Sequence, residues 1–215
     1  MTDGSTEFEV GFVVEGHGDI KAVPTVFRRI AELEFPQLRV ITREVFRVPR
    51  DKLKKQDELE RTVELLARRL NGTRAILITI DTEGEAPGCL GPELLRRACL
   101  RRPDVPIGVA VAHHEFENWF IAAAESLAGF RDLQVDIVCP QYPESIKGAK
   151  EWLSARMVGR PYRETTDQDW LAKRFALDAA CKAPSFSKFY REAVRLCEGA
   201  IETNSRPAGL KPEQR

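Results

Sequence analysis

Ile76-Leu77-Ile78-Thr79-Ile80-Asp81-Thr82-Glu83 contains the strongest strand signal in the sequence. Its near-continuous apolar character predicts a strand over residues 74–81 that is covered on both faces, as strands of parallel sheets are. The strand runs directly into carboxylates. A second apolar run ends in the same way, in Val13-Val14-Glu15-Gly16-His17-Gly18-Asp19. Because ligands of parallel sheets bind at the carboxyl ends of the strands, the two acidic ends predict a shared site.

Strands and helices alternate through the first part of the chain. Apolar runs predict strands over residues 8–15, 38–48, 74–81 and 105–112. Apolar residues at helical spacing predict helices over residues 20–33, 51–70 and 92–101, and another through Trp119, Phe120 and Leu127. Strands that are separated by helices predict a parallel sheet with right-handed crossovers. The expected fold class is therefore α/β, with a parallel sheet of about four strands flanked by helices.

The last third of the chain has a different pattern. Amphipathic stretches predict helices over residues 144–157, 166–181 and 185–197. We expect an α/β domain over residues 1–130, a helical extension packed on it over residues 131–202, and a disordered tail over residues 203–215.

Composition narrows the class of protein. The chain has 215 residues and is 43% hydrophobic, which is enough for one domain with a real core. It carries 33 basic and 33 acidic residues, and this zero net charge argues against a protein that coats nucleic acid through bulk charge. The five cysteines are not at zinc-finger spacing and predict reduced thiols in a cytoplasmic protein. No apolar stretch reaches about 18 residues, so no membrane partner is expected.

Carboxylates follow three of the four predicted strands. They are Glu15 and Asp19 after the first strand, Asp81, Glu83 and Glu85 after the third, and Glu115 and Glu117 after the fourth. Parallel strands share a direction, so we expect these side chains to meet at one edge of the sheet, where hard oxygen ligands suit Mg²⁺, or Mn²⁺ in its place. Plainer interpretations stay open, because Asp19 can cap a helix and Glu115 and Glu117 can favour a helix N-terminus.

Further groups are candidates for contacting a substrate at this edge. Gly16 and Gly18 allow the backbone to approach a ligand, and His17 lies between them. Basic residues of the last third can oppose the carboxylates across a phosphate, although a solvated helix face is the alternative for them. The predicted substrate-binding residues are Gly16, His17, Gly18, Asp19, Lys147 and Arg163.

Two short motifs resemble those of the Toprim domain. Val14-Glu15-Gly16-His17-Gly18-Asp19 resembles the first motif, a strand followed by glutamate and glycine. Ile80-Asp81-Thr82-Glu83 resembles the second, which is normally aspartate, any residue and aspartate, so Glu83 departs from the pattern. The chain is also similar to a bacterial family of small, uncharacterised Toprim-like proteins. The segments that carry this similarity are Glu15-Gly16 with Ala22-Val23-Pro24 and Arg28-Arg29-Ile30, Glu115-Phe116-Glu117-Asn118-Trp119-Phe120, and Ser185-Phe186-Ser187-Lys188-Phe189.

The resemblance implies a Toprim-like sheet and Mg²⁺-dependent phosphodiester chemistry, distantly similar to nucleases of the overcoming-lysogenisation-defect type. It implies that Glu15 acts in acid/base catalysis or metal binding, that Asp81 and Glu83 bind Mg²⁺, and that Lys150 is the second catalytic residue. Glu115 and Glu117 are candidates for a second metal position. The implied substrate is nucleic acid, DNA in preference to RNA, with a separate ATPase subunit, in phage defence or mobile-element biology.

Two other functions stay open. A non-catalytic Toprim-fold module that binds a partner ATPase or a nucleotide is favoured by the zero net charge and by the departure at Glu83. Small-molecule phosphohydrolysis is the third possibility. The chain has no Walker phosphate-binding loop, so any ATP-driven step requires a partner.

Overall fold

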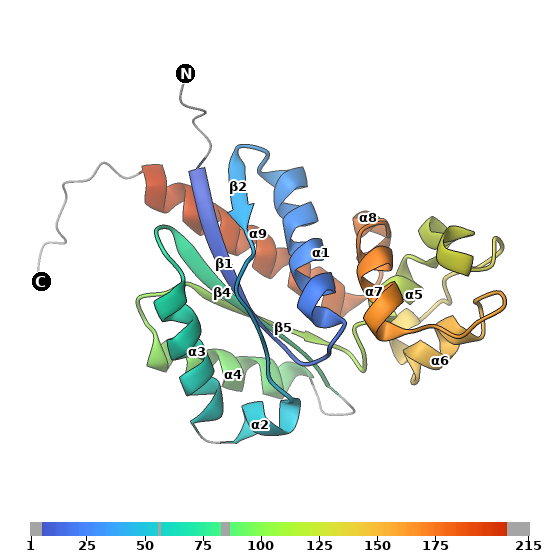
Figure 1. Cartoon of the computed structure of the whole chain (residues 1–215), viewed down its shortest axis with the longest axis horizontal. Helices are drawn as coiled ribbons and strands as arrows, with labels where there is room; N and C mark the ends of the chain where they lie inside the picture. Colours follow the sequence, from blue (N-terminus) through green and yellow to red (C-terminus); the bar gives the residue numbers. More distant parts are fainter. Residues whose placement is uncertain (1–5, 56, 83–86, 206–215) are drawn as a thin grey trace, which may run out of the picture.

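The computed structural model, which describes residues 6–55, 57–82 and 87–205, has a parallel sheet between two layers of helices (Figure 1). In the described residues the strands are β1 (Thr6–Val14), β2 (Leu38–Ile41), β3 (Val45–Arg47), β4 (Arg74–Asp81) and β5 (Ile107–Ala112). Their order is β2-β1-β4-β5, with β3 also paired to β1, and every pairing is parallel. This confirms the expected α/β fold class and is consistent with a Toprim-like fold.

The second predicted strand, residues 38–48, is two short strands rather than one. Both lie on the same side of β1, where Glu9 pairs with Ile41 and Phe12 pairs with Val45. Between these pairs β1 advances from residue 9 to 12, whereas its partner advances from 41 to 45. The partner therefore carries one extra residue, which interrupts the ladder as a β-bulge does.

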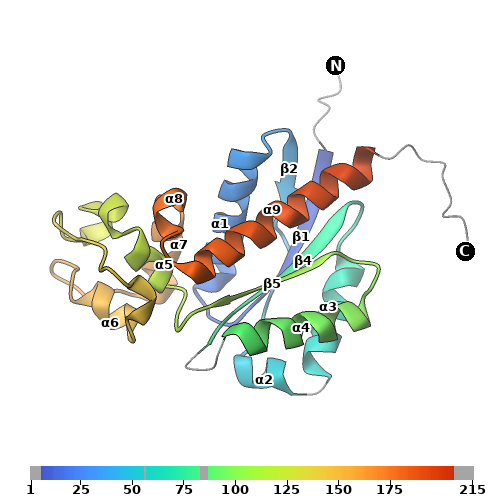
Figure 2. The ribbon, with the colours of Figure 1, turned by 180° about the vertical axis from the view of Figure 1, so that it is seen from behind.

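The two faces of the sheet are covered by different helices (Figures 1 and 2). Helices α1 (Asp19–Glu34) and α9 (Pro184–Ser205) cover one face, and α2 (Arg50–Lys54), α3 (Glu58–Arg69) and α4 (Pro87–Arg101) cover the other. Side chains of β1 serve both cores, because Phe8, Val10 and Phe12 pack on the α1 side and Val13 packs on the α3 side. Burial on both faces explains the continuous apolar runs in the sequence.

Three predicted helices are divided in the structure. Residues 51–70 form α2 and α3, and Asp57 between them has a left-handed backbone. Residues 144–157 form the 3-10 turn η3 (Pro143–Ser145) and α6 (Ala149–Ser154), separated by Gly148 at φ 72°. Residues 166–181 form α7 (Glu164–Ala172) and α8 (Leu177–Ala180). Apolar spacing alone did not locate these interruptions, because the spacing continues across them.

Helix α9 ends at Ser205, whereas the sequence predicted a disordered tail from residue 203. Its last turn is held by side-chain contacts: Thr73 Oγ1 donates to Asn204 Oδ1 at 3.1 Å, and Asn204 Nδ2 donates to Ala200 O at 2.9 Å. The remainder of the predicted tail, residues 206–215, lies outside the described residues.

Short helices between β5 and α9 form what we call the helical segment, residues 118–183, beside the end of the sheet where α1 begins (Figure 1). Its other elements are α5 (Asn118–Ala122) and the 3-10 turns η1 (Ala124–Leu127) and η2 (Phe130–Asp132). Arg29 links α1 to the helical segment, because its guanidinium donates to the carbonyls of Ala172 and Phe175 at 2.8 Å each. Trp119 is fully buried and donates through Nε1 to Ser185 Oγ at 2.8 Å, which gives it a core role.

No helix in the described part of the chain combines the length and the apolar character needed to cross a membrane.

Gly11 of β1 marks the tightest contact between the sheet and α3. A Cβ added there would lie 2.7 Å from Leu66 Cγ, whereas a Cβ at Gly199 in α9 would meet nothing within 4 Å. We expect Gly11→Ala to lower the free energy of unfolding by about 1–3 kcal/mol through overpacking. Gly199→Ala should raise it by about 1 kcal/mol through helix propensity. Urea denaturation of both variants checks this, and a Gly11→Ala protein as stable as the wild type would contradict the packing described.

Candidate functional site

The carboxyl ends of β1, β4 and β5 bring acidic side chains together with a lysine. We call this group of residues the acidic cluster. It consists of Glu15, Asp19, Asp81, Glu115, Glu117, Glu164 and Lys150. The sequence predicted all of these residues except Glu164, and the structure places them at one edge of the sheet.

Glu15 and Asp81 meet because β1 and β4 are hydrogen-bonded neighbours. Val14 pairs with Thr79 in the ladder, so the residues that follow each strand lie side by side. The Asp81 backbone N–H donates to Glu15 Oε2 at 3.2 Å. Burial raises the pKa of the Asp81 carboxyl well above its ordinary value, and the charges of Asp19, Glu117 and Glu15 raise it further.

Asp19 is buried at the start of α1 and holds the glycine loop that follows β1. Its Oδ2 accepts from the Gly16 N–H at 2.8 Å, and its Oδ1 accepts from Gln168 Nε2 at 2.7 Å. Burial raises the pKa of Asp19, although these two hydrogen bonds act in the opposite direction. The carboxylate therefore orders the loop and faces the acidic cluster at the same time.

Gly18 is where the helical segment closes on the loop. Its N–H donates to Glu164 Oε1 at 2.9 Å, and a Cβ there would lie 1.6 Å from Gln168 Oε1. Only glycine fits this contact. The amides of Gly16 and Gly18 both donate to carboxylates within the protein, so the exposed His17 is the part of the loop that faces solvent.

Glu117 is the most deeply buried carboxylate of the cluster, at 1% exposure. Tyr162 Oη donates to its Oε1 at 3.0 Å, and Lys150 Nζ lies 3.7 Å from its Oε2. Burial raises its pKa to about 8 despite the neighbouring lysine charge. Glu117 precedes α5 but makes no side-chain capping bond, so its carboxylate serves the cluster and not the helix end.

Lys150 of α6 is the cation at the centre of the acidic cluster. Its Nζ lies 3.4 Å from Glu115 Oε2 and 3.5 Å from Glu164 Oε2, besides the contact with Glu117. Burial lowers the pKa of Lys150, but the surrounding carboxylates raise it by more, so the net shift is upward. The ammonium therefore stays charged and offsets part of the repulsion among the carboxylates.

Three functional side chains, Tyr162, Glu164 and Gln168, were missed by the sequence analysis. They lie on α7 and the turn before it, and buried Asp167 fixes that turn. The Arg160 guanidinium binds the Asp167 carboxylate through two nitrogens at 2.7 and 2.9 Å, and the Arg163 N–H donates to it at 2.9 Å. In the sequence, Glu164 resembles any acidic residue in the first turn of a solvated helix, so no local signal distinguished it.

Other predicted site residues are not drawn into the cluster. Lys147 and Arg163 are exposed, and in the described residues the Arg163 side chain makes no hydrogen bond or ion pair. Lys147 lies near His114, whose pKa is lowered by burial first, then by His113 and Lys147. Glu83 and Glu85 lie outside the described residues. The roles predicted for these four residues stay predictions.

The chemistry of the donor set fits a hard divalent cation. Several carboxylates share one ammonium, and burial raises the pKa values of Asp19, Asp81 and Glu117. Further positive charge would relieve the remaining repulsion, and carboxylate oxygens are the ligands that Mg²⁺ prefers. In the part of the chain that the structure describes, no three His, Cys, Asp or Glu side chains already form a metal-ligand group. A bound ion would therefore require some of these side chains to turn.

Together, these features define an α/β protein with a buried acidic cluster at the carboxyl ends of its strands. Residues 14–192 match the family described as Domain of unknown function (DUF4276). The match covers well over half of the chain, and the protein belongs to this family. It begins one residue before Glu15 and ends within α9, so it contains the entire acidic cluster. No curated protein matches the chain.

The raised pKa of Glu117 predicts a pH-dependent stability. Because the folded carboxyl binds its proton more tightly than the unfolded one, this residue makes stability fall as pH rises from about 4.5 to about 8. Glu117→Gln removes this dependence and keeps an acceptor for Tyr162. We expect the stability of the variant relative to the wild type to rise across that interval in denaturation curves.

Glu151→Gln is the matched control, because Glu151 is an exposed glutamate on α6 beside Lys150. The pH dependence of stability that Glu117→Gln loses should be retained in Glu151→Gln. A Glu117→Gln protein that keeps the pH dependence of the wild type would contradict the assigned protonation.

Proposed function

We propose that the protein is a Mg²⁺-dependent nuclease, or a related phosphodiester or phosphotransfer enzyme, with a Toprim-like active site. The observation that carries the proposal is the acidic cluster, which joins carboxylates from the ends of three parallel strands to a lysine that contacts Glu115, Glu117 and Glu164. Several carboxylates and a cation at the strand ends of an α/β sheet suit phosphoryl chemistry.

We assign the binding of Mg²⁺, or Mn²⁺ in its place, to Glu15, Asp81 and Glu117. Glu115 lies next to Glu117 on the same turn, and Glu83 joins this set from the sequence motif alone. A bound ion of this kind supplies Lewis-acid polarisation of a phosphoryl oxygen. Burial is the main cause of the raised pKa values of Asp81 and Glu117, and the charge of Asp19 adds to it, so a bound cation would favour the charged form of both carboxyls.

Glu15 and Lys150 are the proposed catalytic residues. Glu15 is only partly buried, so its carboxylate is accessible to accept a proton from an attacking water. The contacts of Lys150 Nζ, at 3.4–3.7 Å, are longer than the roughly 2.7–2.9 Å of a charge-assisted hydrogen bond. The ammonium therefore retains donor capacity for a phosphate oxygen, where it would offset developing negative charge.

The proposed substrate is nucleic acid, DNA in preference to RNA, as the Toprim resemblance implies. The exposed His17, Lys147 and Arg163 are proposed to contact its backbone. A separate ATPase subunit is proposed for any ATP-driven step.

Cleavage assays with single- and double-stranded DNA and RNA, in the presence of Mg²⁺ or Mn²⁺, test the proposal. We expect cation-dependent cleavage that falls by about 100-fold or more in Glu15→Gln, Asp81→Asn and Lys150→Met. The three variants remove, in that order, the proton acceptor, a ligand of the ion and the ammonium that would contact the phosphate. Glu151→Gln, a glutamate on α6 outside the cluster, should retain wild-type activity.

Calorimetric titration with Mn²⁺ separates binding of the ion from cleavage. Binding should be lost in Asp81→Asn and retained in Lys150→Met, which removes a competing cation. A protein that neither binds Mn²⁺ nor cleaves any of these substrates would instead be the non-catalytic module. Binding of Mn²⁺ without cleavage would support the metal site but not catalysis by the protein alone. The cleavage assay would then be repeated on the complex with an ATPase subunit.

A further inference from the structure

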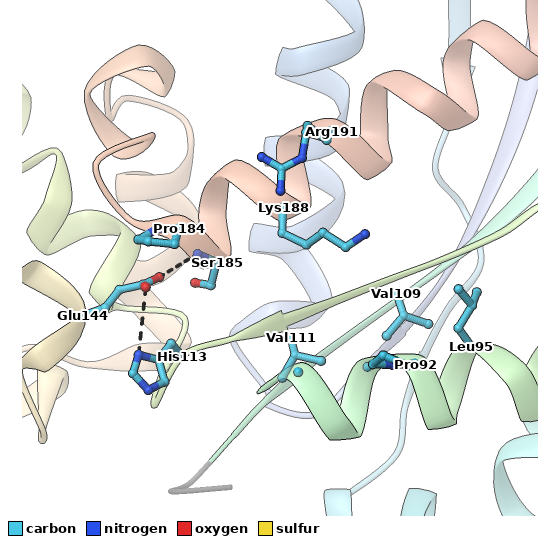
Figure 3. Close-up of a pocket in the computed structure, with 12 residues that line it drawn as sticks. Pro92, Leu95, Val109, Val111, His113, Glu144, Pro184, Ser185, Lys188 and Arg191 are labelled. Atoms are coloured by element: carbon cyan, nitrogen blue, oxygen red, sulfur yellow. Dashed lines mark hydrogen bonds and ion pairs between the residues drawn. The ribbon is translucent and has the colours of Figure 1, made fainter. Parts of the chain in front are cut away.

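A groove distinct from the acidic cluster runs along the outer side of β5, between α4 and α9 (Figure 3). Its volume is about 520 Å³, within the range of roughly 300–1,000 Å³ that is usual for ligand sites. The residues that matter for the argument are Val109 and Val111 of β5, Pro92 and Leu95 of α4, and Lys188 and Arg191 of α9. Figure 3 shows the two basic side chains above the two valines and Pro92.

β5 is the last strand on its side of the described sheet. The Ile76 N–H donates to Pro106 O, and the Thr82 N–H donates to Ala112 O. In a parallel ladder with this register, the backbone groups of Ile107, Val109 and Val111 point away from β4. Arg195 covers one of them by donating to Ile107 O at 2.7 Å.

The backbone groups of Val109 and Val111 are left for an outside partner. Within the described residues neither amide donates, and neither carbonyl accepts, a hydrogen bond beyond the sheet. An edge of this kind is a template for another strand. The apolar floor beneath it suits alternate side chains of an extended peptide, which point to opposite faces of a strand.

Charge along α9 indicates the chemistry of that peptide. Lys188 and Arg195 both pair with Glu192, whereas Arg191 has no ion pair in the described residues. This face of the helix therefore carries three cations and one carboxylate. At the other end of the groove, Glu144 accepts from the Ser185 N–H at 2.9 Å and lies 3.9 Å from His113 Nδ1. The excess charge that a ligand meets along α9 is positive.

We propose that this groove binds an extended acidic segment of a partner protein, which adds to the sheet as a strand beside β5. Its backbone pairs with Val109 and Val111, its apolar side chains enter the groove, and its carboxylates contact Lys188 and Arg191. A second copy of this chain fits less well, because two-fold pairing of β5 edges would bring the two sets of α9 cations toward each other.

Selection of a random eight-residue peptide library on the full-length protein tests this inference. The enriched peptides should alternate acidic with β-branched apolar residues, and fluorescence anisotropy of labelled peptides should measure their affinity. Val109→Pro removes an outward N–H without touching the β4 ladder, and Arg191→Glu reverses the unpaired charge. Each should weaken binding about tenfold or more. Val109→Ala, which keeps the N–H, and Arg68→Glu on α3 are the matched controls.

Amide hydrogen exchange of the wild-type protein tests the same inference without any substitution, so the result does not depend on whether a variant folds. The amides of Val109 and Val111 should exchange faster than those of Gly108 and Ala110 in the free protein, and should become protected when peptide is added. No enrichment of acidic peptides, or binding that is unchanged in both Val109→Pro and Arg191→Glu, would overturn the inference. Sedimentation analysis could instead show a dimer with a micromolar dissociation constant that Val109→Pro abolishes. That result would also overturn the inference, because the β5 edge would then pair with a second copy of the chain.

Discussion

The repulsion among carboxylates at the carboxyl ends of β1, β4 and β5 is the constraint on which the rest of the site depends. Parallel strands deliver these side chains to one edge whether or not their charges are compatible. Lys150 is the response within the fold, since its ammonium lies within 3.7 Å of Glu115, Glu117 and Glu164. Its charge lowers the pKa of Glu117, but burial outweighs this effect and raises the pKa to about 8.

The helical segment contributes to the same cluster at this end of the sheet. Lys150 and Glu164 come from that segment, whereas Glu15 and Asp81 come from the strands. The Gly18 N–H joins the two parts by donating to Glu164, and Arg29 secures the far side of the segment through backbone carbonyls. A chain of polar contacts thus connects the loop after β1 to Glu164 at the start of α7, and Glu164 to Lys150 of α6.

The sequence predicted the features of the site that follow from strand direction. It did not predict those that depend on contacts between residues far apart in the chain. Continuous apolar runs identified β1, β4 and β5, and their shared direction correctly brought Glu15, Asp81 and Glu117 together. Glu164 was missed because its partner, the Gly18 amide, lies 146 residues away, and no local pattern records such a contact. The break in residues 38–48 was missed for a local reason, because strand-favouring apolar residues lie on both sides of the extra residue.

A buried arrangement of like charges is a poor way to gain stability, since well-packed apolar residues in such places are often at least as stabilising. That cost makes a purely structural role for the acidic cluster the weaker explanation. A cation bound among Glu15, Asp81 and Glu117 would lower the repulsion that Lys150 leaves unbalanced. It would also free Lys150 from part of its pairing, because Glu117, whose Oε2 lies 3.7 Å from the ammonium, would then be shared between two cations. Binding of the ion and release of the lysine toward a phosphate are therefore expected to be coupled, and the coupling acts through Glu117, which faces both.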